Sequence, residues 1–246
     1  MNPNNISSPL DFRGRVLYED NHLIVVNKRA GEIVQGDNTG DKPLLELVRD
    51  YLRVAGNKPG NVFCGLVNRI DRPVSGAVLY AKTSKGLSRM NEMIKNRSVE
   101  KIYWAIVEGR PERAEGKLIH YVVKNEKNNK TFTSQTEKNG YQRAELEYKV
   151  LVSSVKYSLM EIRLLTGRHH QIRAQFSAIG CPIKGDLKYG ARRSNEDGSI
   201  CLHARRLSFE HPVAHQWVDI VAEPFNQLFY KMLQDCQKDN AAEIQN

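Results

Sequence analysis

Segments typical of β-strands follow one another along this chain without a helix between each pair. Residues 15–19 and 22–27 are two short apolar runs joined by a tight turn, as in a hairpin. Residues 158–165 alternate apolar and polar side chains, which is the pattern of a half-buried strand. Residues 202–209 and 217–221 are late strands of similar character. Because strands and helices do not alternate strictly, we predict an α+β fold with a mainly antiparallel, mixed central sheet flanked by helices.

Four segments have the pattern of helices that cover such a sheet. Apolar residues recur on one helical face within 44–52 and within 84–94. Another helix is predicted over 169–179, directly after a Thr-Gly turn. The last begins at Pro224, a residue type favoured in the first turn of a helix, and has Phe225 on its apolar side.

Composition and the two ends of the chain suggest a simple domain organisation. Of the 246 residues, 40% are hydrophobic and 26% charged, which is ordinary for a globular protein that buries a substantial core. Both ends are polar. We therefore expect residues 1–14 and 237–246 to be loose tails around a single catalytic domain over 15–236.

The charge of the chain favours a nucleic-acid partner. The formal net charge is +9, which attracts polyanions. The sequence has no apolar run of membrane-spanning length and no signal-peptide pattern at its first residues, so we expect a cytoplasmic protein without a membrane partner. The four cysteines are never spaced as Cys-x-x-Cys and are expected to be reduced thiols.

The segment over residues 65–77 is the most informative about function. It places Asp71 between Arg69 and Arg72, after an apolar run and before a Pro-x-Ser-Gly turn. Nearby positive charge favours the ionised form of a carboxylate, and an ionised carboxylate can attack an electrophilic carbon. Arginines can also bind a phosphate, so the pattern points to chemistry on a nucleotide. The alternative is a surface ion-pair cluster of little energetic value.

A second block, residues 101–109, is a strand with an aromatic pair. Successive side chains of a strand face opposite ways, so one of Tyr103 and Trp104 can belong to the core while the other lines a cleft. We assign Trp104 to the core. Further along, the lysine-rich residues 124–130 are predicted to form a hairpin tip that can touch a phosphate backbone.

A third block, residues 164–175, brings basic residues to the start of a helix. An arginine precedes His169 and His170 there, which makes a ready site for an anion. The two histidines lack the spacing of metal ligands, so we expect no metal. Two later polar residues, Asp186 and His203, are interpreted as structural.

These three blocks resemble, in the same order, the motifs of the RluA-type pseudouridine synthases. Residues 68–76 resemble His-Arg-Leu-Asp-Arg-x-Thr-Ser-Gly, and residues 101–109 match Lys-x-Tyr-x-Ala-x-Val-x-Gly at every fixed position. Residues 166–175 resemble Thr-Gly-Arg-x-His-Gln-Ile-Arg-x-His. The resemblance extends over nearly the whole chain.

The chain departs from this pattern at four positions. Asn68 replaces a histidine, Ile70 a leucine, Val74 a threonine and Gln175 a second histidine. None of these changes removes the aspartate, the tyrosine or the arginines of the motifs. They leave open how the surroundings of the site pack and form hydrogen bonds.

The resemblance implies a pseudouridine synthase fold, with the active-site cleft across the sheet. It also implies an enzyme that isomerises uridine to pseudouridine in structured rRNA or tRNA without a cofactor or metal. Asp71 would promote cleavage of the C1′–N1 bond, either by attack on C1′ or by assisting the loss of a sugar proton. Arg69 would fill the space left by the flipped base, Tyr103 would stack on that base, and Arg173 would pair with the aspartate.

Some members of the family carry an S4-type RNA-binding domain ahead of the catalytic one. Here only about fourteen residues precede the first predicted strand, which is too few for such a domain. We therefore expect a member without it, acting as a monomer and recognising an RNA stem-loop through the catalytic domain.

Two other functions stay open at the level of sequence. The first is a non-catalytic RNA-binding protein or RNA chaperone, against which the intact Asp71 and Tyr103 argue. The second is a metal-dependent nuclease, which would need clustered carboxylates. The carboxylates of this chain are scattered instead.

Overall fold

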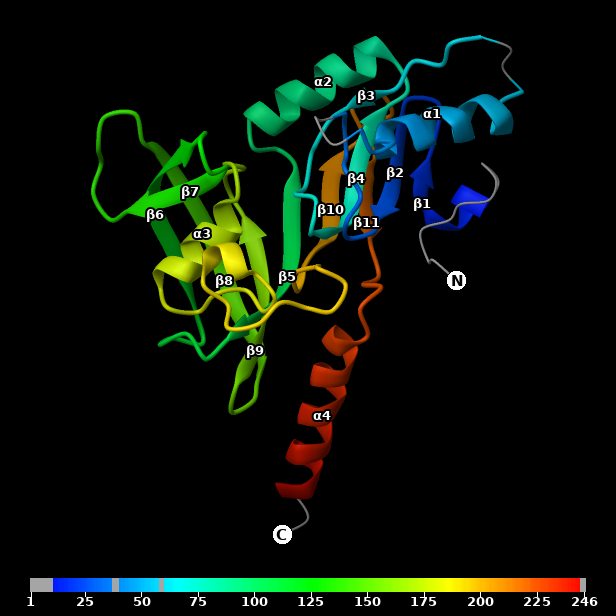
Figure 1. The fold of residues 1–246 in the computed structure, drawn as a ribbon. Coiled ribbons are helices and arrows are strands. Elements are labelled where there is room, and N and C mark those ends of the chain that lie inside the picture. Colours follow the sequence, from blue (N-terminus) through cyan, green and yellow to red (C-terminus); the bar gives the residue numbers. More distant parts are fainter. Residues whose placement is uncertain (1–10, 37–39, 58–59, 244–246) are drawn as a thin grey trace. The chain divides into compact units, whose positions relative to one another are not determined.

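The computed structural model describes residues 11–36, 40–57 and 60–243, and the chain forms two compact units. Unit 1 comprises the chain up to Val99 together with Arg206–Glu223. Unit 2 comprises Glu100–Arg205 and the chain from Pro224 onward. Within the single domain predicted over 15–236, the chain thus leaves unit 1 after Val99 and returns to it at Arg206. Figure 1 labels the elements of both units.

Unit 1 contains the strand order β1-β2-β4-β10, with β3 paired to β4 and β11 paired to β10. The pairings β1–β2, β2–β4, β3–β4 and β10–β11 are all antiparallel. Strand β10 begins in unit 2 and ends in unit 1. The bounds are β1 (Val16–Glu19), β2 (Leu23–Lys28), β3 (Gly65–Leu66), β4 (Ser75–Ala81), β10 (Leu202–Glu210) and β11 (Trp217–Val221).

Helix α2 (Ser84–Lys95) covers one face of this sheet, as its periodicity predicts. Thr83 caps the helix, because its side chain accepts a hydrogen bond from the backbone of Gly86. Met90 is fully buried, and its helical neighbours Leu87, Met93 and Ile94 pack against the same cluster. That cluster consists of alternate strand residues, including Leu23, Val25, Ala77 and Leu79.

Helix α1 (Leu44–Ala55) lies on the chain segment that follows the loop after β2, and it confirms the predicted helix. The opposite face of β4 carries Tyr80, which is fully buried. Its hydroxyl donates to the carbonyl of Val34, which also accepts a hydrogen bond from Leu45 in the first turn of α1. Both faces of the sheet are therefore covered.

The stretch expected to be a loose N-terminal tail is ordered where the structure describes it. Asp11–Arg15 form a 3-10 helix. Phe12 in this helix is 1% exposed, and its ring lies 5.8 Å from that of Tyr51 on α1. One buried ring fixes the segment, although its neighbours in sequence are polar. Residues 1–10, the rest of that predicted tail, lie outside the described residues.

Unit 2 contains the strand order β10-β5-β9-β8-β6-β7. The pairings β5–β9, β9–β8, β8–β6 and β6–β7 are antiparallel, which confirms the predicted α+β fold with mainly antiparallel strands. The hairpin of β6 and β7 closes at Asn125 and Lys130, so the hairpin tip predicted over 124–130 is also confirmed. The bounds are β5 (Glu100–Glu108), β6 (Glu115–Asn125), β7 (Lys130–Ser134), β8 (Gln142–Ser153) and β9 (Tyr157–Leu164).

Helix α3 (Gln171–Ala178) lies on the same face of this sheet as Tyr103. The strand register places Tyr103 opposite Ile162, and Ile162 opposite Tyr148, so their side chains share one face. Phe176 of α3 packs on Tyr148 with the ring centroids 5.7 Å apart. The helix that carries Arg173 is therefore on the Tyr103 face.

Helix α4 (Leu228–Glu243) packs against the opposite face of the unit 2 sheet. Phe229 joins a cluster with Ile106, and Trp104 packs against that cluster. The predicted start at Pro224 is wrong, because the helix begins only at Leu228. The side chain of Asn226 accepts a hydrogen bond from the backbone of Leu228 at this start. Phe225 is accordingly 45% exposed instead of lying on the buried side.

The same helix extends into the stretch that was expected to be a loose C-terminal tail. The backbone is helical as far as Glu243, so much of the stretch expected to be a loose tail over 237–246 is helical. Residues 244–246 lie outside the described part of the chain. None of the helices in the described ranges is long and apolar enough to cross a membrane.

Candidate active site

Asp71 lies in unit 1 on the loop that joins β3 to β4. The backbone carbonyl of Asp71 accepts a hydrogen bond from Val74, which closes a tight turn. Ile70 on one side and Val74 on the other are buried, at 8% and 2% exposure, while Asp71 itself is half-buried. The carboxylate is therefore carried on a turn that is anchored by apolar side chains on both sides.

Arg72 belongs to the support of this turn. Its Nη2 donates to Asp41 at 2.5 Å, and its Nε donates to the carbonyl of Gly31 at 3.0 Å. The backbone of Gly31 in turn donates to the carbonyl of Arg72. The sequence suggested that both arginines flank the carboxylate; instead, the guanidinium of Arg72 is bound by the loop before α1. Arg69 is exposed on the same turn.

A buried lysine that the sequence did not single out lies beneath the turn. Lys28, the last residue of β2, is 0% exposed, and its Nζ donates to the carbonyls of Arg29 at 2.9 Å and Arg72 at 3.1 Å. Burial lowers the pKa of Lys28 to about 7, although the charges of Glu32 and Asp71 act in the opposite direction. A lysine at the end of a strand is normally exposed to solvent, so the sequence pattern did not predict that Lys28 is buried.

The lysine makes the stability of unit 1 depend on pH. Between about pH 7 and the ordinary lysine pKa of 10.5, the unfolded chain binds more protons than the folded one. The free energy of unfolding should therefore rise with pH in this window, by up to about 1.4 kcal/mol per pH unit from this group. We expect Lys28→Met to remove this contribution in denaturant unfolding followed from pH 6 to pH 10.

The change in slope is the diagnostic quantity, because methionine also removes the two hydrogen bonds that the lysine donates to backbone carbonyls. Lys42→Met, at a lysine that forms an exposed ion pair with Asp50, serves as the control and should keep the wild-type slope. Equal slopes in the Lys28→Met and wild-type proteins would contradict this account of the buried amine.

Arg173 lies in unit 2 and is held by a buried carboxylate. Its Nε donates to Asp186 at 2.6 Å and its Nη2 donates to the same carboxylate at 2.9 Å. The side chains of this pair are only 5% and 2% exposed. The guanidinium carbon also lies 5.0 Å from the ring centre of Tyr189, within the range of a cation–π contact. Two sides of the guanidinium are thus fixed by the segment that follows α3.

His170 extends this support and explains where α3 begins. It has φ 48°, a left-handed conformation, so the helix starts at Gln171 instead of at the predicted residue 169. Burial, together with the charge of Arg173, lowers the pKa of His170 to about 2, so the ring is neutral. The Tyr189 hydroxyl accepts from the backbone of Thr131 at 2.8 Å, which leaves its proton for Nδ1 of His170 at 2.9 Å.

His169 is held by the β6–β7 hairpin. Thr131 Oγ1 donates to the carbonyl of His169 and lies 2.8 Å from its Nδ1. The rings of His169 and His170 stack with centroids 3.7 Å apart. Across the described ranges, no group of three or more His, Cys, Asp or Glu residues is arranged to hold a metal ion.

The aromatic pair of β5 divides as the alternation of a strand predicts. Tyr103 is 7% exposed and lies on the α3 face. Trp104 faces the other way, is partly buried and packs against the cluster that contains Phe229 and Ile106, in agreement with its assignment to the core. The guanidinium of Arg205 lies 4.5 Å from the ring centre of Trp104. Of the predicted site residues, unit 2 therefore carries Tyr103 and Arg173 on one face of its sheet, and unit 1 carries Arg69 and Asp71.

The departures from the family pattern are accommodated locally. Asn68 Oδ1 accepts from the backbone of Leu79 at 2.7 Å, which ties the Asp71 loop to β4. Gln175 is fully buried, and its Nε2 donates to the carbonyls of Leu118 at 3.2 Å and Ala144 at 3.3 Å. The side chains of Ile70 and Val74 are buried, as noted above. Packing and hydrogen bonds around the site are therefore intact at all four positions.

Asp186 and His203, which the sequence indicates are structural, are both buried, at 2% and 0% exposure. The structure adds that Asp186 is the carboxylate that orients Arg173. Arg173 and Asp186 are thirteen positions apart in sequence, and this spacing does not indicate that they pair. Burial of an aspartate beside a glycine-rich turn is visible only once the segment is folded.

Comparison with known proteins identifies relatives over most of the chain. The family described as "RNA pseudouridylate synthase" matches residues 22–178. Ribosomal large subunit pseudouridine synthase D of Zymomonas mobilis is 33% identical over 242 residues, covering 92% of this chain and 75% of that protein. Ribosomal large subunit pseudouridine synthase C of Vibrio parahaemolyticus is 30% identical over 231 residues, covering 92% of this chain and 70% of that protein.

A solved structure has the same fold. Human RNA Pseudouridylate Synthase Domain Containing 4 superimposes with a TM-score of 0.76 and covers 92% of this chain and 94% of its own. The sequence identity is 23%, so this likeness concerns the fold.

Proposed function

This chain belongs to the RNA pseudouridylate synthase family, and from that membership we propose that it isomerises uridine to pseudouridine in ribosomal RNA with Asp71 as the catalytic carboxylate. The family identifies the enzyme as an RNA pseudouridine synthase. The choice of large-subunit rRNA rests on relatives that are named for that substrate. One observation carries the assignment of Asp71: it lies inside the matched region, on a turn held by buried neighbours.

The reaction moves one bond and one proton. The C1′–N1 bond of uridine breaks, the freed uracil turns, and a C1′–C5 bond forms. The proton lost from C5 is balanced by the proton gained at N1. We propose that Asp71 promotes the first step, by attack on C1′ or by assisting loss of a sugar proton. This scheme calls on no cofactor.

Three other residues are proposed to act on the same uridine. Arg69, exposed on the Asp71 turn, would fill the space that the flipped base leaves. Tyr103 would stack on the uracil while it turns. Arg173 would pair with Asp71, and its bidentate bond to Asp186 supports this role because that bond fixes Nε and Nη2. A guanidinium held in this way loses little freedom when it meets a second carboxylate.

We further propose that the two units together make one catalytic domain over 15–236. In this proposal the protein acts as a monomer in the cytoplasm, and its substrate is an RNA stem-loop. The net charge of +9 and the lysines of the β6–β7 hairpin support recognition of a phosphate backbone.

A pseudouridine map of total RNA tests this function. Cells that lack the gene should lose pseudouridine at one or a few positions of large-subunit rRNA, and purified wild-type protein should restore them in vitro. Restoration in excess chelator is the control that separates this enzyme from a metal-dependent nuclease. Identical maps with and without the gene would contradict the proposal, and loss confined to tRNA would overturn the choice of substrate.

A further inference from the structure

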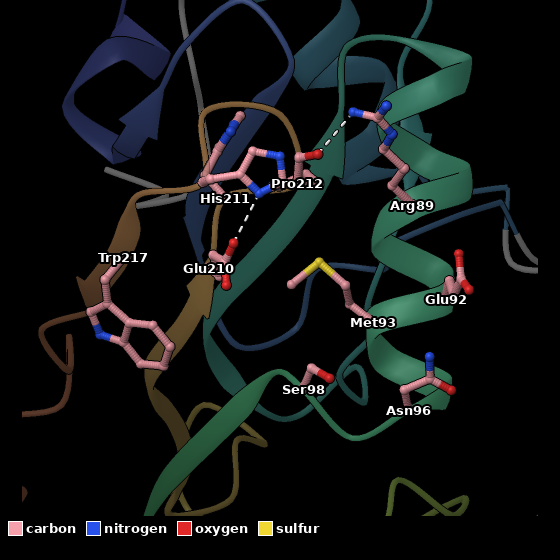
Figure 2. A pocket seen from close by; sticks show the side chains of 10 residues that line it. Arg89, Glu92, Met93, Asn96, Ser98, Glu210, His211, Pro212 and Trp217 are labelled. Carbon is pink, nitrogen blue, oxygen red and sulfur yellow. Dashed lines mark hydrogen bonds and ion pairs between the residues drawn. The ribbon is translucent and has the colours of Figure 1, made fainter.

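A second candidate binding site lies in unit 1, between α2 and the hairpin of β10 and β11. It is a pocket of about 580 Å³, within the range of small-ligand sites. Figure 2 shows its two walls, one formed by α2 and the other by the hairpin turn. None of the lining residues belongs to the Asp71 loop. The residues that line it are Arg89, Glu92, Met93, Asn96, Ser98, Glu210, His211, Pro212, His215 and Trp217.

The walls of this pocket are joined and preformed. Arg89 of α2 donates from Nη1 to the carbonyl of Pro212 at 2.8 Å, which ties the helix to the hairpin turn (Figure 2). His211 is 2% exposed, and its Nδ1 accepts from the backbone of Ala214 at 2.9 Å. Its Nε2 therefore carries the proton and lies 2.8 Å from the carboxylate of Asp20. The hairpin turn is therefore already held in position before any ligand binds.

An exposed indole forms one side of the pocket. Trp217 is the first residue of β11 and is 63% exposed. Val218 and Ile220 of the same strand point into the core. Because successive side chains of a strand face opposite ways, Trp217 points to solvent. Figure 2 shows its ring across the pocket from Glu92 and Asn96. An exposed tryptophan beside a preformed pocket is a platform on which a flat ring can stack.

Helix α2 and the residues directly after it carry more positive than negative charge. Helix α2 and the residues after it carry Lys85, Arg89, Lys95 and Arg97 against a single acid, Glu92. All but Arg89 of these cations are exposed. The other wall carries a second carboxylate, that of Glu210, which lies 2.9 Å from Nδ1 of His215. A polyanion with flat rings fits this combination better than an apolar peptide does.

We propose that this pocket binds one unpaired nucleotide of the RNA substrate, at a position other than the modified uridine. The base stacks on Trp217, its edge meets the side chains of Asn96 and Ser98, and the adjoining phosphates lie near the cations of α2. The identity of the ligand rests on the proposed function, since the RNA is the one that the enzyme modifies. The site adds affinity for the RNA and takes no part in the reaction.

Substitution of the indole tests the proposal. Stacking of one base on an aromatic ring contributes enough that Trp217→Ala should weaken RNA binding by about tenfold. We expect KM for the rRNA fragment to rise with it, while kcat at saturating RNA is unchanged. Trp217→Phe should retain most of the affinity. The fold should survive both changes, because the side chain is exposed.

A matched control and a direct signal accompany these variants. Val221→Ala changes a residue on the same outward face of β11 that does not line the pocket, and it should bind RNA like the wild type. RNA should also quench tryptophan fluorescence in the wild type and not in Trp217→Phe, which retains only Trp104.

The outcomes separate this inference from the function on which it rests. Wild-type protein that neither binds nor converts RNA would overturn both. Wild-type conversion of uridine, with unchanged RNA affinity and unchanged quenching in the Trp217 variants, would overturn the pocket alone. Unchanged RNA affinity together with a protein partner that the wild type retains and Trp217→Ala loses would assign the surface to that partner instead.

Discussion

Replacing Asp71 with asparagine is expected to abolish pseudouridine formation while RNA binding persists. Asparagine has the shape of aspartate but cannot act as the carboxylate nucleophile or base, so we expect kcat to fall by at least about 10⁴-fold. The turn should be retained, because the hydrogen bond that closes it uses the backbone carbonyl of residue 71. Single-turnover conversion of an rRNA fragment gives the rate, and a gel-shift titration gives the affinity.

Asp41→Asn is the matched control for this experiment. Asp41 is an exposed carboxylate of the same unit, and it binds Arg72 of the Asp71 turn. Its loss weakens one exposed ion pair, so we expect a change in rate of less than about tenfold. A rate that survives Asp71→Asn would mean that another group performs the chemistry, and the mechanism would have to be abandoned.

Asp186→Asn is expected to have the second-largest effect, on both stability and rate. It removes the negative charge that compensates the buried guanidinium of Arg173, and breaking a buried pair from one side costs about 3 kcal/mol in the free energy of unfolding. If Arg173 aims the catalytic carboxylate, its displacement should also lower kcat by about a hundredfold. Denaturant unfolding and single-turnover rates measure the two effects separately.

Asp219→Asn is an informative comparison for this prediction. Asp219 receives the same two bonds, from Nε and Nη2 of Arg206, but its pair is 44% and 38% exposed. Hydrogen bonds from Arg206 hold the pKa of Asp219 below its usual range, yet solvent screens the pair. We expect this variant to lose less than about 1 kcal/mol and to retain full activity. Equal losses in the two variants would show that burial of the Arg173 pair is unimportant.

A positioning role for Asp186 requires more than a loss of stability. Asp186→Glu keeps the charge and should recover part of the rate, whereas Asp186→Asn should not. Substrate affinity should change little in either variant, because the pair is buried and belongs to the support of the site. If kcat of the folded Asp186→Asn protein equals that of the wild type, Arg173 does not depend on this carboxylate.

Much of the fold could be predicted from local patterns. The alternation within β9 and the apolar face of α2 each depend on neighbours in sequence, and both were visible there. The β6–β7 hairpin was also visible, because a polar run between strand patterns is typical of a turn. The apolar run before Asp71 and the Pro-x-Ser-Gly turn after it likewise agree with its observed position on the loop between β3 and β4.

The features that sequence did not predict depend on contacts between distant segments. Phe12 is buried because its ring packs against the ring of Tyr51 on α1. The polar residues next to Phe12 in sequence do not indicate this contact. Lys28 is buried because the carbonyl of Arg72, from a loop far along the chain, receives its amine. The sequence does not indicate that Asp186 is the partner of Arg173, because such a pair depends on where the fold places both segments.

The division of unit 1 between two stretches of chain has a consequence for biosynthesis. Leu207, Phe209, Val218 and Ile220 belong to the same cluster as Leu23 and Leu79, yet the ribosome adds them only after Glu100–Arg205 have been made. Because chains emerge from the N-terminus first, the early strands must wait with an open apolar face while unit 2 is translated. A nascent chain arrested near residue 150 should therefore be a target for chaperones, and neither unit can be cut out as an uninterrupted fragment for expression.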